Sequence, residues 1–293
     1  MAAQLMLLRD TLHHLGNFLS VGFIVFHFHK HIKLMRVMYH PRTRHLIRRH
    51  PKIVYKYLVK YAALNLATRC RLALVTSHYS LMQKFFNDAF ADMVYGDKLV
   101  LWKSEQADSR LTIDLDFPAT FHTEGDLCIS MKLAGRAVYR LVFILSSGAT
   151  FGLEQQNVVF ITCVQGLVSQ STLRPILSEC DETHPADVLM AAVQGVAVSL
   201  GIGTLVGIRT EQQVCSSEKT YFSYDNFFEE YGMLDRGMNA YLIRVPMQRK
   251  DLSLIPSKHR ARARRKRVFR DAICESVQRT LAPYLIETSH RIA

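Results

Sequence analysis

Through most of residues 1–93, apolar residues recur three or four positions apart, and glycines are few. This spacing places apolar side chains on one face of an α-helix, so the pattern predicts a helical N-terminal region over residues 1–93. Pro41 and Pro51 interrupt the pattern. Because proline lacks an amide donor and fixes φ, each favours the start of a helix or a break in one.

From Gly96 onward the pattern changes to short runs of β-branched and aromatic residues that Asp, Gly and Pro separate. Such runs are typical of strands joined by tight turns, and they predict an antiparallel meander over residues 97–166. The last run, residues 157–166, is continuously apolar and favours a central strand covered on both faces. The segment after it, residues 167–183, predicts a long loop.

Helical and strand patterns then alternate to the end of the chain. A helix is expected from near Pro185 to Gly201, because proline suits a first helical turn and glycine suits a helix end. Two further strands are predicted in TLVGIR and NAYLIRVPM, with a short helix in SYDNFFEEYG between them. A long, basic amphipathic helix is expected over residues 257–284.

These elements predict an α+β fold. A helical N-terminal region, residues 1–93, precedes a mixed domain, residues 94–293, whose sheet is largely antiparallel. Within that domain the meander of residues 97–166 leads into a strand–helix–strand unit over residues 157–210, and the basic helix follows.

Positive charge is concentrated in two segments. Residues 1–71 hold 13 Lys and Arg but one acid, residues 72–256 carry a net charge of −7, and residues 257–270 carry +8. Cations at the start of a helix oppose the helix dipole, so the segment 257–270 needs an anion nearby. That anion is either an external partner or the acidic body of the protein, including the acids of YDNFFEEYG.

The cations of the segment that we select as anion-binding candidates are Lys258, Arg260, Arg264, Arg265 and Arg267. An anionic lipid surface and a phosphate-bearing ligand both fit such a segment. Sequence-specific nucleic-acid recognition does not fit it, because alanines stand among the cations and an alanine makes no hydrogen bond to a base edge.

An apolar run at residues 15–28 bears on where the protein acts. Its 14 residues fall short of the ~20 that a bilayer-spanning helix needs, and no small-residue cleavage site follows it. We therefore expect a cytoplasmic protein that can bind the inner membrane peripherally. The six cysteines show no metal-ligand spacing, so no metal is expected.

Asp225 and Glu229 stand four residues apart within YDNFFEEYG, so they share one face of the predicted short helix. Carboxylates beside aromatic residues can act as general bases, because burial raises their pKa. We therefore select both as candidate catalytic residues. The same pattern also fits a half-buried helix whose acids pair with arginine.

Six motifs, in this order, resemble the VirK/YbjX family of bacterial proteins over most of the chain. They are SHYSLM, TEGDLCISMKLAGRAVYRLVFIL, CVQG, HPADVLMAAVQGVAVSLGI, YDNFFEEYG and SKHRARARRKR. The resemblance implies a Gram-negative bacterial protein that acts at the cell envelope, in virulence or in maintaining surface properties. It implies no particular reaction.

The predicted order of elements is also similar to that of GNAT-type acyltransferases, which implies acyl-CoA or an acyl carrier protein as the donor. Those enzymes bind the acyl-CoA pyrophosphate on backbone amides after the central strand. The similarity places Gln165 and Gly166 at that position and the basic helix start near the 3′-phosphate. It adds Glu124 to the candidate bases, and Tyr224 is a further ligand-binding candidate.

Three functions therefore remain open. The first is an accessory protein at the cytoplasmic face of the envelope, the second is an acyltransferase, and the third is a regulatory protein that binds nucleic acid through charge alone.

Overall fold

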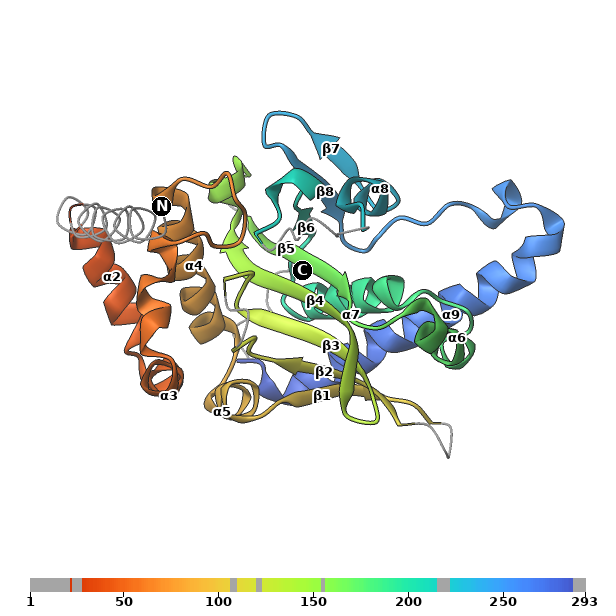
Figure 1. The fold of residues 1–293 in the computed structure, drawn as a ribbon, viewed down its shortest axis with the longest axis horizontal. Helices are drawn as coiled ribbons and strands as arrows, with labels where there is room; N and C mark the ends of the chain where they lie inside the picture. Colours follow the sequence, from red (N-terminus) through yellow and green to blue (C-terminus); the bar gives the residue numbers. More distant parts are fainter. Residues whose placement is uncertain are drawn as a thin grey trace, which may run out of the picture.

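A computed structural model describes residues 22, 28–105, 110–119, 123–153, 156–214 and 222–286. The N-terminal part of these residues is helical, as predicted (Figure 1). Its elements are α2 (Phe28–Met38), α3 (Pro41–Arg49), the 3-10 helix η1 (Pro51–Leu58), α4 (Thr68–Phe85) and α5 (Asp88–Gly96). Pro41 and Pro51 each occupy a first helical turn, where the missing amide donor costs nothing.

The predicted mixed, largely antiparallel sheet is confirmed. Eight strands lie in the order β1-β2-β3-β4-β5-β6-β8-β7, and every neighbouring pair is antiparallel except the parallel pair β5 and β6. The strands are β1 (Leu99–Lys103), β2 (Leu111–Asp116), β3 (Leu127–Leu133), β4 (Arg136–Ser147), β5 (Asn157–Gly166), β6 (Thr204–Gly207), β7 (Met233–Asp235) and β8 (Ala240–Arg244). The pattern of the sequence did not predict β7, because three residues are too few to show alternation.

The connection from β5 to β6 differs from the prediction in one respect. The expected loop contains a helix, α6 (Gln170–Glu179), whose signal was hidden because Pro175 lies inside it and most of its residues are polar. The helix that follows, α7 (Pro185–Ser199), starts where Pro185 predicts. Gly201 ends this segment with φ +64°, a conformation that favours glycine.

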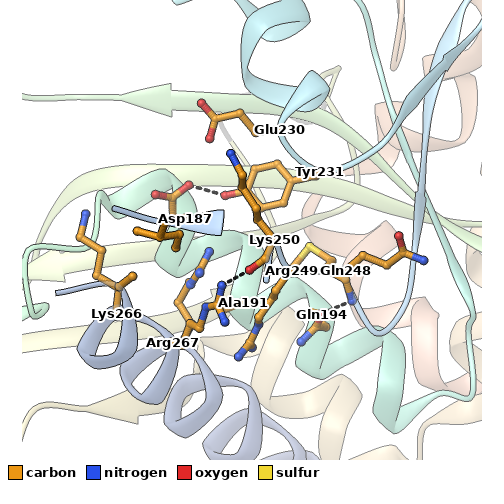
Figure 2. A pocket seen from close by; sticks show the side chains of 14 residues that line it. Asp187, Ala191, Gln194, Glu230, Tyr231, Gln248, Arg249, Lys250, Lys266 and Arg267 are labelled. Atoms are coloured by element: carbon orange, nitrogen blue, oxygen red, sulfur yellow. Dashed lines mark hydrogen bonds between the residues drawn. The ribbon is translucent and has the colours of Figure 1, made fainter. Parts of the chain in front are cut away.

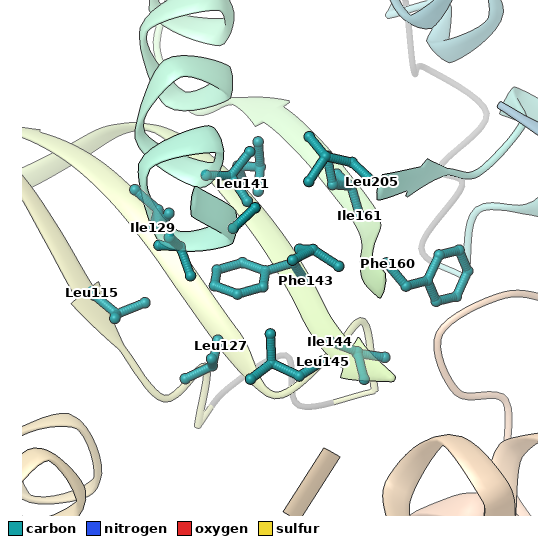
Figure 3. Packing of buried hydrophobic residues seen from close by; sticks show 14 of the residues in the cluster. Leu115, Leu127, Ile129, Leu141, Phe143, Ile144, Leu145, Phe160, Ile161 and Leu205 are labelled. Carbon is teal, nitrogen blue, oxygen red and sulfur yellow. The ribbon is translucent and has the colours of Figure 1, made fainter. Parts of the chain in front are cut away.

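Two helices cover one face of the sheet (Figure 1). α7 packs on β3, β4 and β5, and α9 (Ser257–Leu281) packs on α7 and β1. Ile129, Leu141 and Phe143 project from neighbouring strands into the resulting core (Figure 3). The short helix α8 (Tyr224–Glu229) follows β6.

The SHYSLM motif of α4 joins the N-terminal helices to the sheet. The Ser147 amide donates to Ser77 Oγ at 2.7 Å, and the Leu145 amide donates to His78 Nδ1 at 3.1 Å. Tyr79 Oη donates to Asp126 at 2.6 Å. The motif therefore fixes the ends of two strands to one helix.

Among the described residues, none of the helices combines the length and the apolar character needed to cross a membrane. The apolar run at residues 15–28 lies outside the described residues, apart from Gly22 and Phe28.

Candidate functional site

β6 pairs with only part of β5, so one edge of β5 continues beyond the end of β6. Residues Val159 to Ile161 of β5 pair with β6, which ends at Gly207, whereas β5 continues to Gly166. The hydroxyl group of Tyr224 lies on this continuing edge. It accepts a hydrogen bond from the Val164 amide at 3.0 Å and donates to the Val164 carbonyl at 3.1 Å.

Local contacts hold Tyr224 in this place. Its amide donates to Thr210 Oγ1 at 2.9 Å, and Gln213 Nε2 donates to its hydroxyl at 2.9 Å. The side chain is fully buried. The sheet comes close to α8 at Gly207, where a Cβ would lie 2.8 Å from the ring of Phe228.

A buried carboxylate lies on the same part of the sheet. The register of the strands pairs Arg140 of β4 with Gln165 of β5, and Arg140 Nη2 donates to Gln165 Oε1 at 2.5 Å. Arg140 Nη2 is also 3.3 Å from Glu124 Oε2. Glu124 is 1% exposed, and neither of its oxygens accepts a well-aligned hydrogen bond from a described residue. A buried carboxylate that is held by an ion pair but accepts no well-aligned hydrogen bond still has lone pairs that can accept a proton.

The thiol of Cys163 interacts with both the Glu124 carboxylate and the Tyr224 hydroxyl. Burial raises the pKa of Cys163 and the Glu124 carboxylate raises it further, whereas Arg140 and the Tyr224 hydroxyl lower it. The pKa of Tyr224 is well above its ordinary value, first through burial and then through Cys163. Cys163 therefore remains a thiol at neutral pH, and Tyr224 stays protonated, with its proton in the hydrogen bond to the Val164 carbonyl. We refer to Glu124, Arg140, Cys163, Gln165 and Tyr224 as the Glu124 cluster.

A cavity of about 290 Å³ borders the cluster. Arg140 lines it together with Asp116 and Lys132, and Lys132 Nζ is 3.3 Å from Asp116. Ser130 and Lys132 alternate along β3 with Ile129 and Met131, which belong to the core, so the cavity lies on the sheet face opposite the core. Arg140 therefore contacts both the buried Glu124 carboxylate and a cavity whose wall carries positive and negative side chains.

The structure brings together three of the predicted site residues, Glu124, Gln165 and Tyr224. Gly166 lies at the end of the same strand, where a Cβ would come within 2.9 Å of the Tyr139 ring. Arg140 and Cys163 had not been predicted. Arg140 had a signal in the sequence, because it is the one charge within the strand AVYRLVFIL, whereas Cys163 had none.

The two acids of α8 belong to a different network. Arg209 Nε donates to Asp225 at 2.9 Å, and Tyr241 Oη is 3.1 Å from Asp225 and 3.4 Å from Glu229. Burial opposes ionisation of Asp225, but hydrogen bonds from Thr210 and Arg209 outweigh it and keep its pKa below the ordinary value. Asp225 is therefore held as an ionised partner of arginine, which ties α8 to the loop after β6.

The basic residues of α9 do not share one environment. Lys258, Arg264 and Arg265 are exposed. Arg260 donates to the carbonyls of Ile255 and Ser253. Arg267 donates to the carbonyl of Lys250 and lines a second cavity, which is described below. Among the ion pairs of the described residues, none joins this helix to Asp225 or Glu229.

Within the described parts of the chain, no three side chains among His, Cys, Asp and Glu are grouped so that they could hold a metal ion. Within the Glu124 cluster, Arg140 lines the cavity, whereas Tyr224 and Glu124 are buried.

Comparison with known proteins gives the family. A family described as "Protein of unknown function (DUF535)" matches residues 21–279. The chain is similar to the Uncharacterized protein YbjX of Escherichia coli (strain K12), with 23% identity over 246 residues that make up 80% of this chain and 73% of YbjX. No solved structure matches the chain. Because the family match covers most of the sequence, the protein belongs to the DUF535 family, the VirK/YbjX family that its motifs resemble.

Proposed function

We propose that this protein is an acyltransferase that moves an acyl group from a thioester donor, acyl-CoA or an acyl carrier protein, to an amine or hydroxyl acceptor. The observation that carries the proposal is the Glu124 cluster. A buried carboxylate, Glu124, and a protonated tyrosine hydroxyl, Tyr224, both interact with Cys163, near the part of β5 that continues beyond its pairing with β6. Acyl transfer needs one group that accepts a proton and another that donates one.

The order of the elements supports the proposal. The antiparallel meander leads into β5, α6 and α7 connect β5 to the parallel strand β6, and β8 lies between β6 and β7 in the sheet. We extend to this arrangement the expected similarity to GNAT-type acyltransferases, in which the donor lies beyond the end of the central strand. The corresponding position in this chain is the end of β5, at Gln165 and Gly166.

The chemistry of the step uses both side chains. The acceptor nitrogen or oxygen attacks the thioester carbonyl carbon, the new C–N or C–O bond forms, and the C–S bond breaks. Glu124 accepts the proton that the acceptor loses, and Tyr224 donates its proton to the departing thiolate. The Cys163 thiol can relay a proton from Glu124 back to Tyr224, so the net change moves one proton from the acceptor to the thiol.

The cavity beside Arg140 supports a class of acceptor. Asp116, Lys132 and Arg140 bring charges of both signs to its wall. An acceptor that carries an amine and an anionic group could pair with both kinds of charge. We therefore propose a polar, zwitterionic acceptor rather than an apolar one.

The test measures thiol release from long-chain acyl-CoA in the presence of a panel of amine and hydroxyl acceptors, with mass spectrometry of the acylated product. Glu124→Gln should lower the rate by about 100-fold or more, because that is the usual contribution of a general base. Glu275→Gln, an exposed residue of α9, is the matched control and should keep the full rate. The proposal fails if the unmodified protein releases no thiol, or if Glu124→Gln is as active as the control.

A second role, at a membrane surface, has an observation of its own. Arg264, Arg265 and Val268 lie within one turn of α9, and Val268 is 68% exposed. Exposed cations beside an exposed apolar side chain suit the interface of an anionic membrane, which fits the expected action at the cytoplasmic face of the envelope. We propose that this face of α9 binds anionic lipid.

Flotation with liposomes of phosphatidylglycerol and phosphatidylethanolamine tests the membrane role. We expect binding that weakens severalfold in Arg264→Gln/Arg265→Gln and in Val268→Ser, and binding that is unchanged in Glu275→Gln. Equal binding by all variants would refute it. Charge-driven nucleic-acid binding stays a prediction, and a steep dependence of duplex binding on salt concentration is its signature.

A further inference from the structure

A second cavity shares no lining residue with the Glu124 cluster. It has a volume of about 270 Å³ and is enclosed by α7, the end of α8, the segment after β8 and α9 (Figure 2). Five cations line it, and two carboxylates face them. The cations are Arg249, Lys250, Lys266, Arg267 and Arg270, and the carboxylates are Asp187 and Glu230. The lining therefore carries a net charge of +3.

Internal contacts hold the frame of the cavity in place. The Met247 amide donates to Gln194 Oε1 at 2.7 Å, which fixes the segment after β8 against α7. Tyr231 donates its hydroxyl proton to Asp187, so that carboxylate already has a partner (Figure 2). Arg249 forms an ion pair with Asp271. The frame is thus built by groups that satisfy one another.

Three of the cations, Lys250, Lys266 and Arg270, are not used by this frame, and of these Lys250 is exposed whereas Lys266 and Arg270 are half-buried. Among the described residues, neither Lys266 nor Arg270 forms an ion pair, and the Nε atom of Arg270 is buried without a hydrogen-bond acceptor. Burial, followed by the charge of Arg262, lowers the pKa of Lys266. An anion between these side chains would oppose both effects and would accept the unused hydrogen bond.

We propose that the cavity binds a phosphate group, carried as a phosphate monoester or a diphosphate, through Lys266 and Arg270. A dianion matches the net charge of the lining better than a singly charged carboxylate does. Guanidinium groups also fit phosphate oxygens in a bidentate manner. The cavity and the Glu124 cluster have no residue in common, so this inference does not rest on the proposed acyl transfer.

The same group could belong to a soluble metabolite or to a lipid headgroup, and the probes separate the two. Calorimetric titrations use inorganic pyrophosphate, adenosine 3′,5′-bisphosphate and short-chain phosphatidic acid below its micelle concentration. We expect at least one of them to bind with a Kd below about 1 mM. Displacement of pyrophosphate by the bisphosphate alone indicates a soluble ligand, and displacement by the phosphatidic acid indicates a lipid.

Matched variants separate a specific site from general attraction by charge. Lys266→Gln/Arg270→Gln should weaken pyrophosphate binding at least tenfold. Arg136→Gln/Arg279→Gln removes the same charge from two exposed positions outside the cavity and should leave the binding unchanged. Glu124→Gln should also bind normally, so a loss of acyl transfer there is distinguishable from a failure of the phosphate site.

A measurement on the unmodified protein tests the phosphate site without relying on the correct folding of a variant. Pyrophosphate should protect Lys266 from acetylation by acetic anhydride, as measured by peptide mass spectrometry, while the exposed Lys258 on the same helix is acetylated at the same rate with or without it. The inference is overturned if none of the three probes binds, if both double variants lose affinity equally, or if Lys266 and Lys258 are protected alike.

Discussion

The ammonium group of Lys56 forms an ion pair with the carboxylate of Asp126, and both side chains are fully buried. The hydroxyl groups of Tyr61 and Tyr79 also donate to this carboxylate. Lys56 comes from η1 in the N-terminal helices, whereas Asp126 immediately precedes β3. Because Asp126 is two residues from Glu124, the ion pair also anchors the segment that carries the proposed base.

Lys56→Met should destabilise the protein strongly. The substitution leaves Asp126 as a buried carboxylate without a counter-charge, which costs about 3–5 kcal/mol. Equilibrium unfolding in urea measures this loss. Lys60→Met, at an exposed position of the same segment, should change the free energy of unfolding by less than about 0.5 kcal/mol.

A double variant checks whether the uncompensated charge is the cause of that loss. Lys56→Met/Asp126→Asn removes both charges and keeps an oxygen that Tyr61 and Tyr79 can donate to, so it should recover a large part of the stability. If the double variant is no more stable than Lys56→Met, the ammonium group contributes through its packing, for instance over the Tyr61 ring at 4.4 Å, and not through its charge.

Stability should fall as the pH decreases from about 6.5 towards 4. Burial lowers the pKa of His78 to about 4 in the folded protein, whereas an unfolded chain has a histidine pKa near 6.5. The unfolded state therefore binds the proton more tightly over this range, and protonation favours unfolding. The difference corresponds to about 3 kcal/mol lost on acidification, measured by urea unfolding at a series of pH values.

His78→Asn is the matched variant for that experiment, because an Asn oxygen can still accept a hydrogen bond from the Leu145 amide. We expect its stability to depend less on pH between 6.5 and 4 than that of the unmodified protein. His45→Asn, at an exposed position, should keep the original dependence. Identical pH profiles for all three proteins would show that His78 is not the group responsible.

The parts of the fold that were predictable from sequence are those with strong local signals. Pro185 and Gly201 bound α7 because proline and glycine each have a conformational preference that acts within one turn. By contrast, the low apolar content of α6 and its internal Pro175 hid that helix. The order of the strands depends on contacts between distant segments, so no local pattern determines it.

The candidate site could be predicted only in part, for a similar reason. Glu124, Gln165 and Tyr224 were selected from separate motifs, and their proximity follows from the pairing of β4 with β5 and from the position of α8. Asp225 was selected as a candidate general base because aromatic residues stand beside it in the sequence. Its partner Arg209 lies 16 residues away, and only the folded chain brings the two together.

Tyr224→Phe should lower the free energy of unfolding, whether or not it also lowers activity. Removal of the hydroxyl leaves the amide and carbonyl of Val164 without their partner at a buried edge, which costs about 1–3 kcal/mol. Urea unfolding measures the cost, and hydrogen exchange at the Val164 amide should become faster. Tyr55→Phe, an exposed residue, is the control. Slow exchange at Val164 in the variant would mean that another group pairs with this edge.

Gly195→Ala should destabilise the protein, although alanine is normally favoured over glycine in a helix by about 1 kcal/mol. The reason is the close approach of α7 to α9, because a Cβ at this position would lie 2.7 Å from the Cys274 carbonyl oxygen and 2.8 Å from Val277 Cβ. Backbone atoms cannot move aside cheaply, so the helices must separate, and we expect a net loss of about 1–3 kcal/mol in urea unfolding.

The same substitution links packing to the proposed phosphate site. Because α7 contributes Gln194 to the cavity and α9 contributes Lys266 and Arg270, separating the helices should also weaken pyrophosphate binding. Gly203→Ala is the control, since a Cβ there meets no atom within 4 Å, and it should change neither stability nor binding appreciably. A gain in stability for Gly195→Ala would show that the two helices pack less closely than this contact requires, and the cavity between them would then not be held at a fixed width.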